Sequence, residues 1–485
     1  MENSTELHKV VYHVLLTQIQ FGAYGSGENL PTIEETGARL CVSVDTARAA
    51  YLKLKEQGYI TLSKNVGATV NRNYDAAESE QFIQAFFALR KNAMIDLVNS
   101  IGPLFGNAQW TGLKNASSQT LHSIEVLSGK VNLPAPYAML EHLNQKYSSL
   151  GNSLLMRLVW QIFMFLYVPF FSIEENLHNF GQSADYLPEI LTLCRSQNWP
   201  ALRAALDRSF EKLSVAVKEF YLSRITLPCP ADETTFRWSS YEKSQQLCYS
   251  FAMELLVAIN RGIYPAGSLL PSQKQLARQR GISLSTVRRA LELLTSVGAI
   301  KSAKYVGTWV LPSDKTTENS DFSKPVLQRR LLDTVKSLQV FALSCNDVSR
   351  LTLSALDAGS LRKLCDDLKA HKQWRRGEIL SYHTLELFAK HAPYQAIRTV
   401  YSELLRQFFW GYMLRGMKGS QETINAMYDP YFDSLIDALE KMDIPRFSAC
   451  LEALIIRELG STVKILSQLG IPGAERILIP DEKEI

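Results

Sequence analysis

The sequence predicts a mainly α-helical protein in which two winged helix-turn-helix domains, each with a small β-wing, alternate with two all-helical bundles. A stretch of helix, tight turn, helix and two-stranded ribbon occurs twice, and the copies align without a gap at a shift of roughly 240 residues. The segment after each copy carries apolar residues every three to four positions and few strand signals. We therefore expect an internal duplication of a winged head followed by a helical bundle.

The aligned positions of the two copies share the residue types that define such a head. The shared pairs are Tyr24 and Tyr264, Leu30-Pro31 and Leu270-Pro271, Ser43 and Ser283, Thr46 and Thr286, Arg48 and Arg288, Leu54 and Leu294, Gly58 and Gly298, and Val66-Gly67 and Val306-Gly307. A repeat of this length is a duplicated domain and not a solenoid unit.

These patterns divide the chain into heads, bundles and polar linkers. The expected segments are a first head at 1–73, a first helical region at 74–226, a linker at 227–240, a second head at 241–312, a linker at 313–325 and a second helical region at 326–475. About six helices fit the first helical region. Its most apolar run, Leu158–Phe171, is too short to span a bilayer, so we expect a buried helix and no membrane association.

The second copy shows the helix signals most clearly. Pro271 is expected at the first helical position of the motif, and Gly281 is expected to end that helix in a tight turn. Ser283 or Ser285 then caps the next helix. A helix, a tight turn, a helix and a basic ribbon follow one another in winged domains that read double-stranded DNA.

Charge separates the two heads. The whole chain has a formal net charge of only +4. From Tyr241 to Pro312 there are nine basic and three acidic residues, a net charge of +6, whereas Glu6 to Asn73 has seven basic and six acidic residues, a net charge of +1. The second head therefore carries the basic field that phosphate binding needs.

The candidate DNA contacts lie on the predicted recognition helix and the ribbon. Arg288 and Arg289 are placed to bond guanine, although a solvated face that pairs Arg with Glu292 is the alternative. The candidates in the second copy are Lys274, Ser285, Thr286, Arg288, Arg289, Lys301, Lys304 and Gly307. Those in the first copy are Thr46, Arg48, Lys64 and Gly67. In the first copy we expect Arg48, Thr46 and Lys64 to face the acidic pair Glu34-Glu35, so a degenerate head kept for packing is the alternative there.

The seven cysteines indicate a reducing compartment. They are odd in number, scattered, and include no C-x-x-C pair. This usage suits free thiols in a cytoplasmic protein better than a disulfide framework or a zinc site.

Two segments resemble the GntR family of bacterial transcription regulators over about 70 residues each. They read LPSQKQLARQRGISLSTVRRALELLTSVGAI…VGTWV and LPTIEETGARLCVSVDTARAAYLKLKEQGYI…VGATV. The helical regions more weakly resemble the all-helical (FCD-like) domain of such regulators: His142 precedes Gly151-Asn152, and His383 precedes Ala392-Pro393, at matching places. The resemblance implies a regulator whose helical domain dimerises and senses a small molecule.

Both heads depart from the family pattern in their basic residues. Leu284 and Val44 stand where family heads often have an Arg early in the recognition motif. Lys274 and Glu34 stand where another Arg is usual.

The helical regions lack the metal ligands that the resemblance would imply. Many members bind a metal through one Asp and three His. Here Ala138 and Ile379 occupy the places where an Asp would precede His142 and His383. Because a metal site needs several converging ligands, we expect no metal and no other cofactor.

Five residues are candidates for an effector pocket, with core packing as the alternative for the aromatic ones. They are His383, Arg406, Trp410, His142 and Trp160. Arg406 and Arg415 could pair an anionic effector, but an exposed helix face explains them equally well.

The resulting hypothesis is a cytoplasmic, non-enzymatic DNA-binding regulator. Its two bundles would pack as an intrachain pseudo-dimer in a monomer, with a homodimer as the alternative. Two other classes stay open: a protein-interaction adaptor with degenerate heads, or an enzyme fused to a regulator head. No Gly-rich phosphate loop or Ser/His/Asp constellation supports the enzyme.

Overall fold

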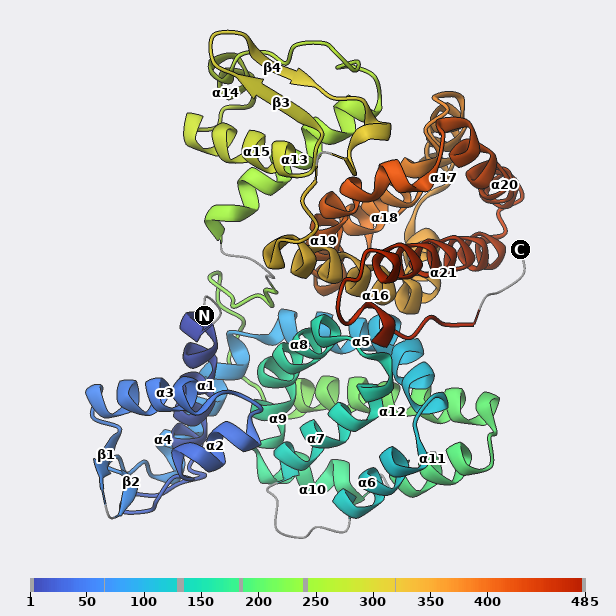
Figure 1. Cartoon of the computed structure of the whole chain (residues 1–485). Helices are drawn as coiled ribbons and strands as arrows, with labels where there is room; N and C mark the ends of the chain where they lie inside the picture. Colours follow the sequence, from blue (N-terminus) through green and yellow to red (C-terminus); the bar gives the residue numbers. More distant parts are fainter. Residues whose placement is uncertain are drawn as a thin grey trace. The chain divides into compact units, whose positions relative to one another are not determined.

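The computed structural model describes residues 4–64, 66–128, 135–182, 186–238, 243–318 and 320–481 (Figure 1). The expected boundary between the first linker and the second head, at 240/241, lies outside the described residues. The chain forms two compact units. The first comprises Met1–Gly102, Gln109–Ser149 and Met156–Phe236, and the second comprises Pro103–Ala108, Leu150–Leu155 and Arg237–Ile485.

The two heads repeat the same elements at a constant offset. The first head contains α1 (Ser4–Gln20), α2 (Ile33–Arg39), α3 (Val44–Glu56), β1 (Ile60–Ser63) and β2 (Gly67–Val70). The second contains α13 (Lys243–Asn260), α14 (Gln273–Arg280), α15 (Leu284–Ser296), β3 (Ile300–Ala303) and β4 (Gly307–Val310). Each strand pair is an antiparallel hairpin, with Ile60 opposite Val70 and Ile300 opposite Val310. The predicted pair of winged helix-turn-helix domains is confirmed.

The first helix of the second motif starts two residues later than expected, at Gln273. The prediction that Pro271 is the first helical residue is wrong, because Ser272 is the N-cap. Its hydroxyl accepts from the Gln275 amide, and the Gln275 side chain accepts from the Ser272 amide. This capping box satisfies two backbone donors at the helix start and so fixes where α14 begins.

A left-handed residue forms the turn in both heads. Gly281 ends α14 with φ 63°, as expected, and Cys41 occupies the same place in the first head with φ 54°. Ser283 then caps α15, and Ser43 caps α3 in the same way. The turn and cap together set the angle at which each recognition helix leaves the motif.

The first helical region contains more helices than the six expected. It runs through α4 (Ala76–Ala88), α5 (Lys91–Lys114), α6 (Ser118–Ser128), α7 (Ala135–Tyr147), η1 (Ser148–Leu150), α8 (Ser153–Ile162), η2 (Phe163–Tyr167), α9 (Val168–Phe171), α10 (Glu174–Gln182), α11 (Tyr186–Arg195) and α12 (Trp199–Ser223). The apolar run 158–171 is not one regular helix, because η2 is a π-helical turn between α8 and α9. The stretch Ser153–Phe171 is long and apolar enough to cross a membrane. However, 72% of it is buried inside the protein, and buried core helices pass the same test of length and composition.

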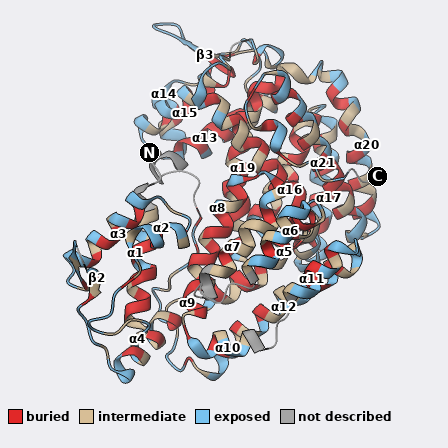
Figure 2. Cartoon of the chain, turned by 60° about the horizontal axis from the view of Figure 1, so that its bottom comes forward, coloured by how far each residue is buried: buried red, intermediate tan, exposed pale blue. Residues whose placement is uncertain are grey.

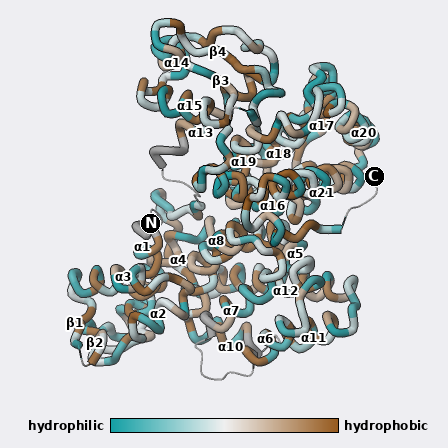
Figure 3. Tube along the Cα trace, viewed as in Figure 1, coloured by the Kyte–Doolittle hydropathy of each residue, from teal (hydrophilic) through white to brown (hydrophobic). Residues whose placement is uncertain are grey.

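The second helical region is built around two long helices, α16 and α21, which pack along each other. Its elements are η3 (Ser313–Lys315), α16 (Pro325–Ala355), α17 (Ala358–Gln373), η4 (Gly377–Ile379), α18 (Leu380–His391), α19 (Gln395–Gly411), η5 (Tyr412–Lys418), α20 (Gln421–Glu440), α21 (Ile444–Gln468) and η6 (Ala474–Arg476). Buried residues run through α16 and α21 in Figure 2. Hydrophobic and hydrophilic residues alternate along the helices in Figure 3, as amphipathic helices require.

The first head shares an apolar core with its own helical region. Tyr51 and Leu54 of α3 belong to the same buried cluster as Leu140 of α7 and Phe163 of η2. The Trp160 indole Nε1 donates to the carbonyl of Leu40, at the turn of the motif, over 2.6 Å. Within the first unit, the head is therefore fixed to the helices that follow it.

We expect Gly281→Ala to lower the free energy of unfolding of the second head by about 1 kcal/mol, because an L-residue pays that cost in the left-handed region. A Cβ at Gly281 would meet nothing within 4 Å, so the effect reports backbone conformation alone. Chemical denaturation measures it. Gly25→Ala is the control, since a Cβ there meets its nearest atom at 3.8 Å and needs no left-handed φ; equal losses in both variants would contradict the explanation.

Candidate nucleic-acid interface

The orientation of α15 decides which side chains the second head exposes. The inward face, which is buried as α15 packs on α13, consists of Val287, Ala290, Leu291 and Leu294. Side chains on the opposite face are exposed, namely Ser285, Arg289 and Glu292. Arg288 is also exposed and lies beside α14, where its Nε donates to the Gln273 Oε1 over 3.3 Å.

Hydroxyl groups cluster at the N-terminus of α15. The Ser283 Oγ accepts from the Thr286 amide over 3.1 Å and lies 2.8 Å from both the Ser285 Oγ and the Thr286 Oγ1. Helix N-termini carry unpaired amide groups and a partial positive charge that favour anions. This end of the helix is therefore suited to a DNA phosphate.

The hairpin β3–β4, which we call the wing, exposes further cations. Lys301, Lys304 and Gly307 are all exposed, as is Lys274 on α14. The sequence interpretation missed Tyr305 at the hairpin tip, whose side chain is 94% exposed and whose φ is 67°. The Lys304 Nζ lies 5.1 Å from the centre of its ring. The signal available in the sequence was the position of an aromatic residue between a Lys and the wing glycine.

An ion pair lies near the start of the recognition helix of the first head. The Arg48 Nη1 pairs with the Asp45 Oδ1 over 3.1 Å. That Arg48 also faces Glu34-Glu35 stays a prediction. Asp45 stands where the second head has Ser285. Thr46 is only 4% exposed, and its hydroxyl lies 2.8 Å from the Ser43 Oγ.

The wing of the first head keeps its two candidates at the surface. Lys64 and Gly67 are both exposed. The recognition helix and the wing of this head therefore offer fewer free cations to a phosphate backbone than those of the second head.

His383 lies in a cluster of rings and charges where the end of α13 meets the second helical region. Its ring stacks on His371 at 4.1 Å, and the Arg261 Nη2 lies 3.3 Å from its Nε2. Burial, His371 and Arg261 together lower the pKa of His383 to about 3. His383 is therefore neutral at physiological pH, and it lines one cavity together with Arg406.

Arg406, Trp410 and Trp160 each contact other residues of the protein. Arg406 pairs with Glu403, and Trp410 packs against Tyr249 and Phe409. The indole of Trp160 bonds the first head, so Trp160 serves packing there.

His142 is half-buried and Arg415 is buried. Burial is the main cause that lowers the pKa of His142 to about 4. Arg415 is 4% exposed and its Nε lies 3.4 Å from the Glu378 Oε1, so the exposed-face explanation of this residue is wrong. In the part of the chain that the structure describes, no three His, Cys, Asp or Glu side chains converge as metal ligands would.

Comparisons with known proteins find similarity at the two heads. The family described as "Bacterial regulatory proteins, gntR family" matches residues 7–70 and 251–310. An uncharacterized HTH-type transcriptional regulator, YieP of Escherichia coli K12, is 35% identical over 68 residues, which is 14% of this chain and 30% of that protein. The match thus spans less than a third of this relative.

Solved structures of two regulators also match. One is Streptococcus agalactiae GntR, with 17% identity, a TM-score of 0.17 and coverage of 44% of this chain and 98% of that one. The other is a GntR family member from Pseudomonas syringae pv. tomato DC3000, with 21% identity, a TM-score of 0.19 and coverage of 48% and 91%. TM-scores this low establish no common arrangement of domains.

We expect the second unit to lose stability as pH falls from 7 to 5, by about 1 kcal/mol from His383. The pKa of His383 is lower in the folded than in the unfolded state, so the unfolded chain binds more protons below pH 6.5. The stabilisation from neutral His383 is therefore present above pH 6.5 and is lost as the pH falls toward the folded-state pKa. Urea unfolding at both pH values measures this loss. His383→Gln should reduce the difference between the two pH values, and an unchanged difference would contradict the assignment.

Proposed function

We propose that the chain is a transcription regulator whose second head does most of the DNA reading, because residues 7–70 and 251–310 match the gntR family of bacterial regulatory proteins. The observation that carries the proposal is that Arg288, Arg289, Lys274 and the wing lysines are all exposed. In this proposal α15 enters the major groove and the wing follows the backbone. The site of action is then the cytoplasm, and no step requires catalysis.

We further propose that the first head fills the place of a partner subunit and contributes little to DNA affinity. Its support is the Arg48–Asp45 pair, which places a carboxylate beside the arginine that aligns with Arg288. The core shared with α7 and η2 gives this head a packing role of its own. An adaptor function of the first head is the second candidate that these observations favour.

We propose that the two helical regions pair within one chain, as the two subunits of a homodimer otherwise do. The support is a short segment, Leu150–Leu155, that precedes and begins α8 in the sequence but belongs to the second compact unit. There the Asn152 amide donates to the Gln339 Oε1 over 2.7 Å and to the Lys336 carbonyl over 2.9 Å. Gln339 donates in return to the carbonyl of Leu150 over 2.8 Å.

Close backbone approach accompanies these hydrogen bonds. Gly151 has φ 65°, and a Cβ at this position would lie 2.1 Å from the carbonyl oxygen of Arg476. A glycine is therefore needed both for its conformation and for the contact.

We expect the protein to be monomeric in light scattering, and Gly151→Val to disrupt the contact and expose apolar surface. A wild-type dimer joined through both helical regions would contradict the pairing.

The test of DNA reading is DNA selection with the full chain followed by footprinting of Arg288→Ala. We expect this variant to lose about 1–3 kcal/mol of specific binding, since a bidentate Arg–guanine contact supplies that much. Arg48→Ala is the matched control at the same place in the first head, with a smaller loss expected. An unchanged footprint for Arg288→Ala would remove it from the interface.

The charge difference between the heads gives a reciprocal test. We expect Asp45→Ser to strengthen DNA binding, because it frees Arg48 and removes a carboxylate from the recognition helix. Ser285→Asp should weaken binding by placing that carboxylate in the second head. Gel shifts at several salt concentrations measure both effects, which should shrink as salt rises. If both changes acted alike, the division of labour between the heads would be wrong.

A further inference from the structure

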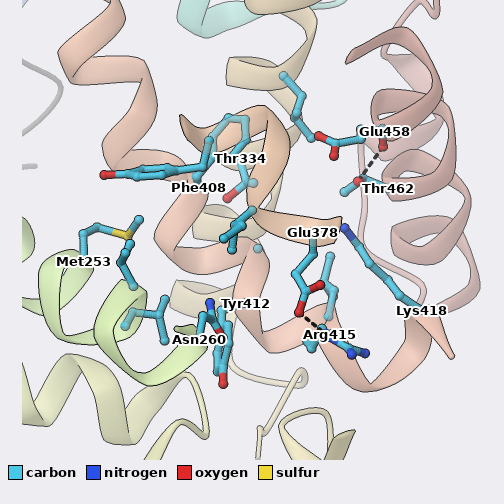
Figure 4. Close-up of a pocket in the computed structure, with 17 residues that line it drawn as sticks. Met253, Asn260, Thr334, Glu378, Phe408, Tyr412, Arg415, Lys418, Glu458 and Thr462 are labelled. Carbon is cyan, nitrogen blue, oxygen red and sulfur yellow. Dashed lines mark hydrogen bonds and ion pairs between the residues drawn. The ribbon is translucent and has the colours of Figure 1, made fainter. Parts of the chain in front are cut away.

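A cavity in the second unit lies between the first helix of the second head and the second helical region. It has about 850 Å³ of empty space including its mouth. Met253, Leu256, Val257 and Asn260 of α13 line one side, and residues of α16, η4, α18, α19, η5 and α21 line the others (Figure 4). A molecule bound here touches the DNA-binding head and the helical region at once.

Most of the cavity wall is apolar. Met253 and Val257 of α13, Leu338 of α16 and Phe408 of α19 contribute to it. Walls of this kind bind the apolar body of a small ligand, while a few polar groups fix its orientation.

Some of the charged groups in the wall are already satisfied by the protein. The Arg415 side chain lies beside Glu378 and donates to the Gln421 Oε1 over 2.6 Å and to the Gly419 carbonyl over 3.0 Å. The Glu458 Oε1 accepts from the Ser381 hydroxyl over 2.7 Å and from the Tyr428 hydroxyl over 2.5 Å. Arg415 and one oxygen of Glu458 therefore support the wall.

Three polar groups in the same wall can still take a hydrogen-bond or ion-pair partner. Tyr412 is 8% exposed, and its buried hydroxyl has no hydrogen-bond partner among the described residues. In the same part of the chain, no hydrogen bond or ion pair engages the Lys418 Nζ or the second carboxylate oxygen of Glu458. Figure 4 shows Lys418 coming from η5 and Glu458 from α21. A buried donor left unpaired costs free energy, and a ligand that pairs it recovers that cost.

We propose that this cavity binds a small zwitterion, an α-amino acid with an apolar side chain; this inference rests on the proposed regulator and names its effector class. The ligand carboxylate pairs with the Lys418 ammonium, and the Tyr412 hydroxyl is a further donor elsewhere in the same wall. The ligand ammonium pairs with the free oxygen of Glu458. The apolar side chain lies against Met253, Val257 and Phe408.

Binding at this place changes the DNA affinity of the second head. The residues of α13 that line the cavity belong to the helix on which α15 packs, so the position of α13 that suits the ligand also sets the position of the recognition helix. By linkage, the factor by which ligand changes the affinity for DNA equals the factor by which DNA changes the affinity for ligand.

The experiment is calorimetric titration of the full chain with L-leucine, L-methionine and L-phenylalanine. 4-Methylpentanoate, which lacks the ammonium of leucine, and 3-methylbutylamine, which lacks its carboxylate, are the matched probes. We expect at least one of the three amino acids to bind. Both truncated probes should bind at least tenfold more weakly than the amino acid that binds most tightly. Lys418→Met and Glu458→Gln should each weaken the amino acid at least tenfold, whereas Lys464→Met, an exposed lysine on α21, should not.

Circular dichroism establishes that each variant is folded, and Glu458→Gln keeps an acceptor for Ser381 and Tyr428. The inference is overturned if none of the three amino acids binds the folded wild type, or if an analogue without the ammonium or without the carboxylate binds as tightly. DNA footprinting without ligand separates this failure from that of the proposed function. A footprint that is intact and depends on Arg288 would support the proposed regulator while the amino-acid ligand alone is contradicted.

Discussion

The packing of α15 on α13 is the contact on which the functional surface depends. It buries Val287, Ala290, Leu291 and Leu294, and this choice of inward face leaves Ser285, Arg289 and Glu292 on the outward one. A recognition helix cannot rotate to present other residues without exposing that apolar face, which costs about 25 cal/mol per Å². The cationic surface is thus a consequence of core packing as much as of charge.

Duplication preserved the backbone of the head while its surface diverged. Both copies have the same caps, the same left-handed turn and the same hairpin register. Cys41 keeps a conformation that Gly281 adopts without strain, and Asp45 pairs with Arg48 at the place where the second copy has Ser285. The two heads therefore share a backbone and differ in the side chains around the aligned arginine.

The heads were predictable from sequence, and the helical regions were predictable only as a class. Turn glycines, capping serines and apolar spacing are local signals, so the repeat of 240 residues identified both motifs. The ion pair Arg48–Asp45 depends on rotamers, and the cavity depends on helices far apart in sequence, from Met253 to Thr462. His383 and Arg406 do meet at one cavity, but the roles of Trp160 and Trp410 follow from packing that no spacing encodes.

Helix α13 connects the two kinds of surface in the second unit. One face of it supports the recognition helix, its lining residues close a cavity against the helical region, and the residue after its last turn, Arg261, lies against His383 and the Trp374 ring. A regulator needs one element whose position both a ligand and DNA influence, because a ligand shifts an equilibrium only through differential contacts with its states. In the second unit α13 contacts the recognition helix and also lines the cavity, so the proposed coupling requires no path longer than one helix.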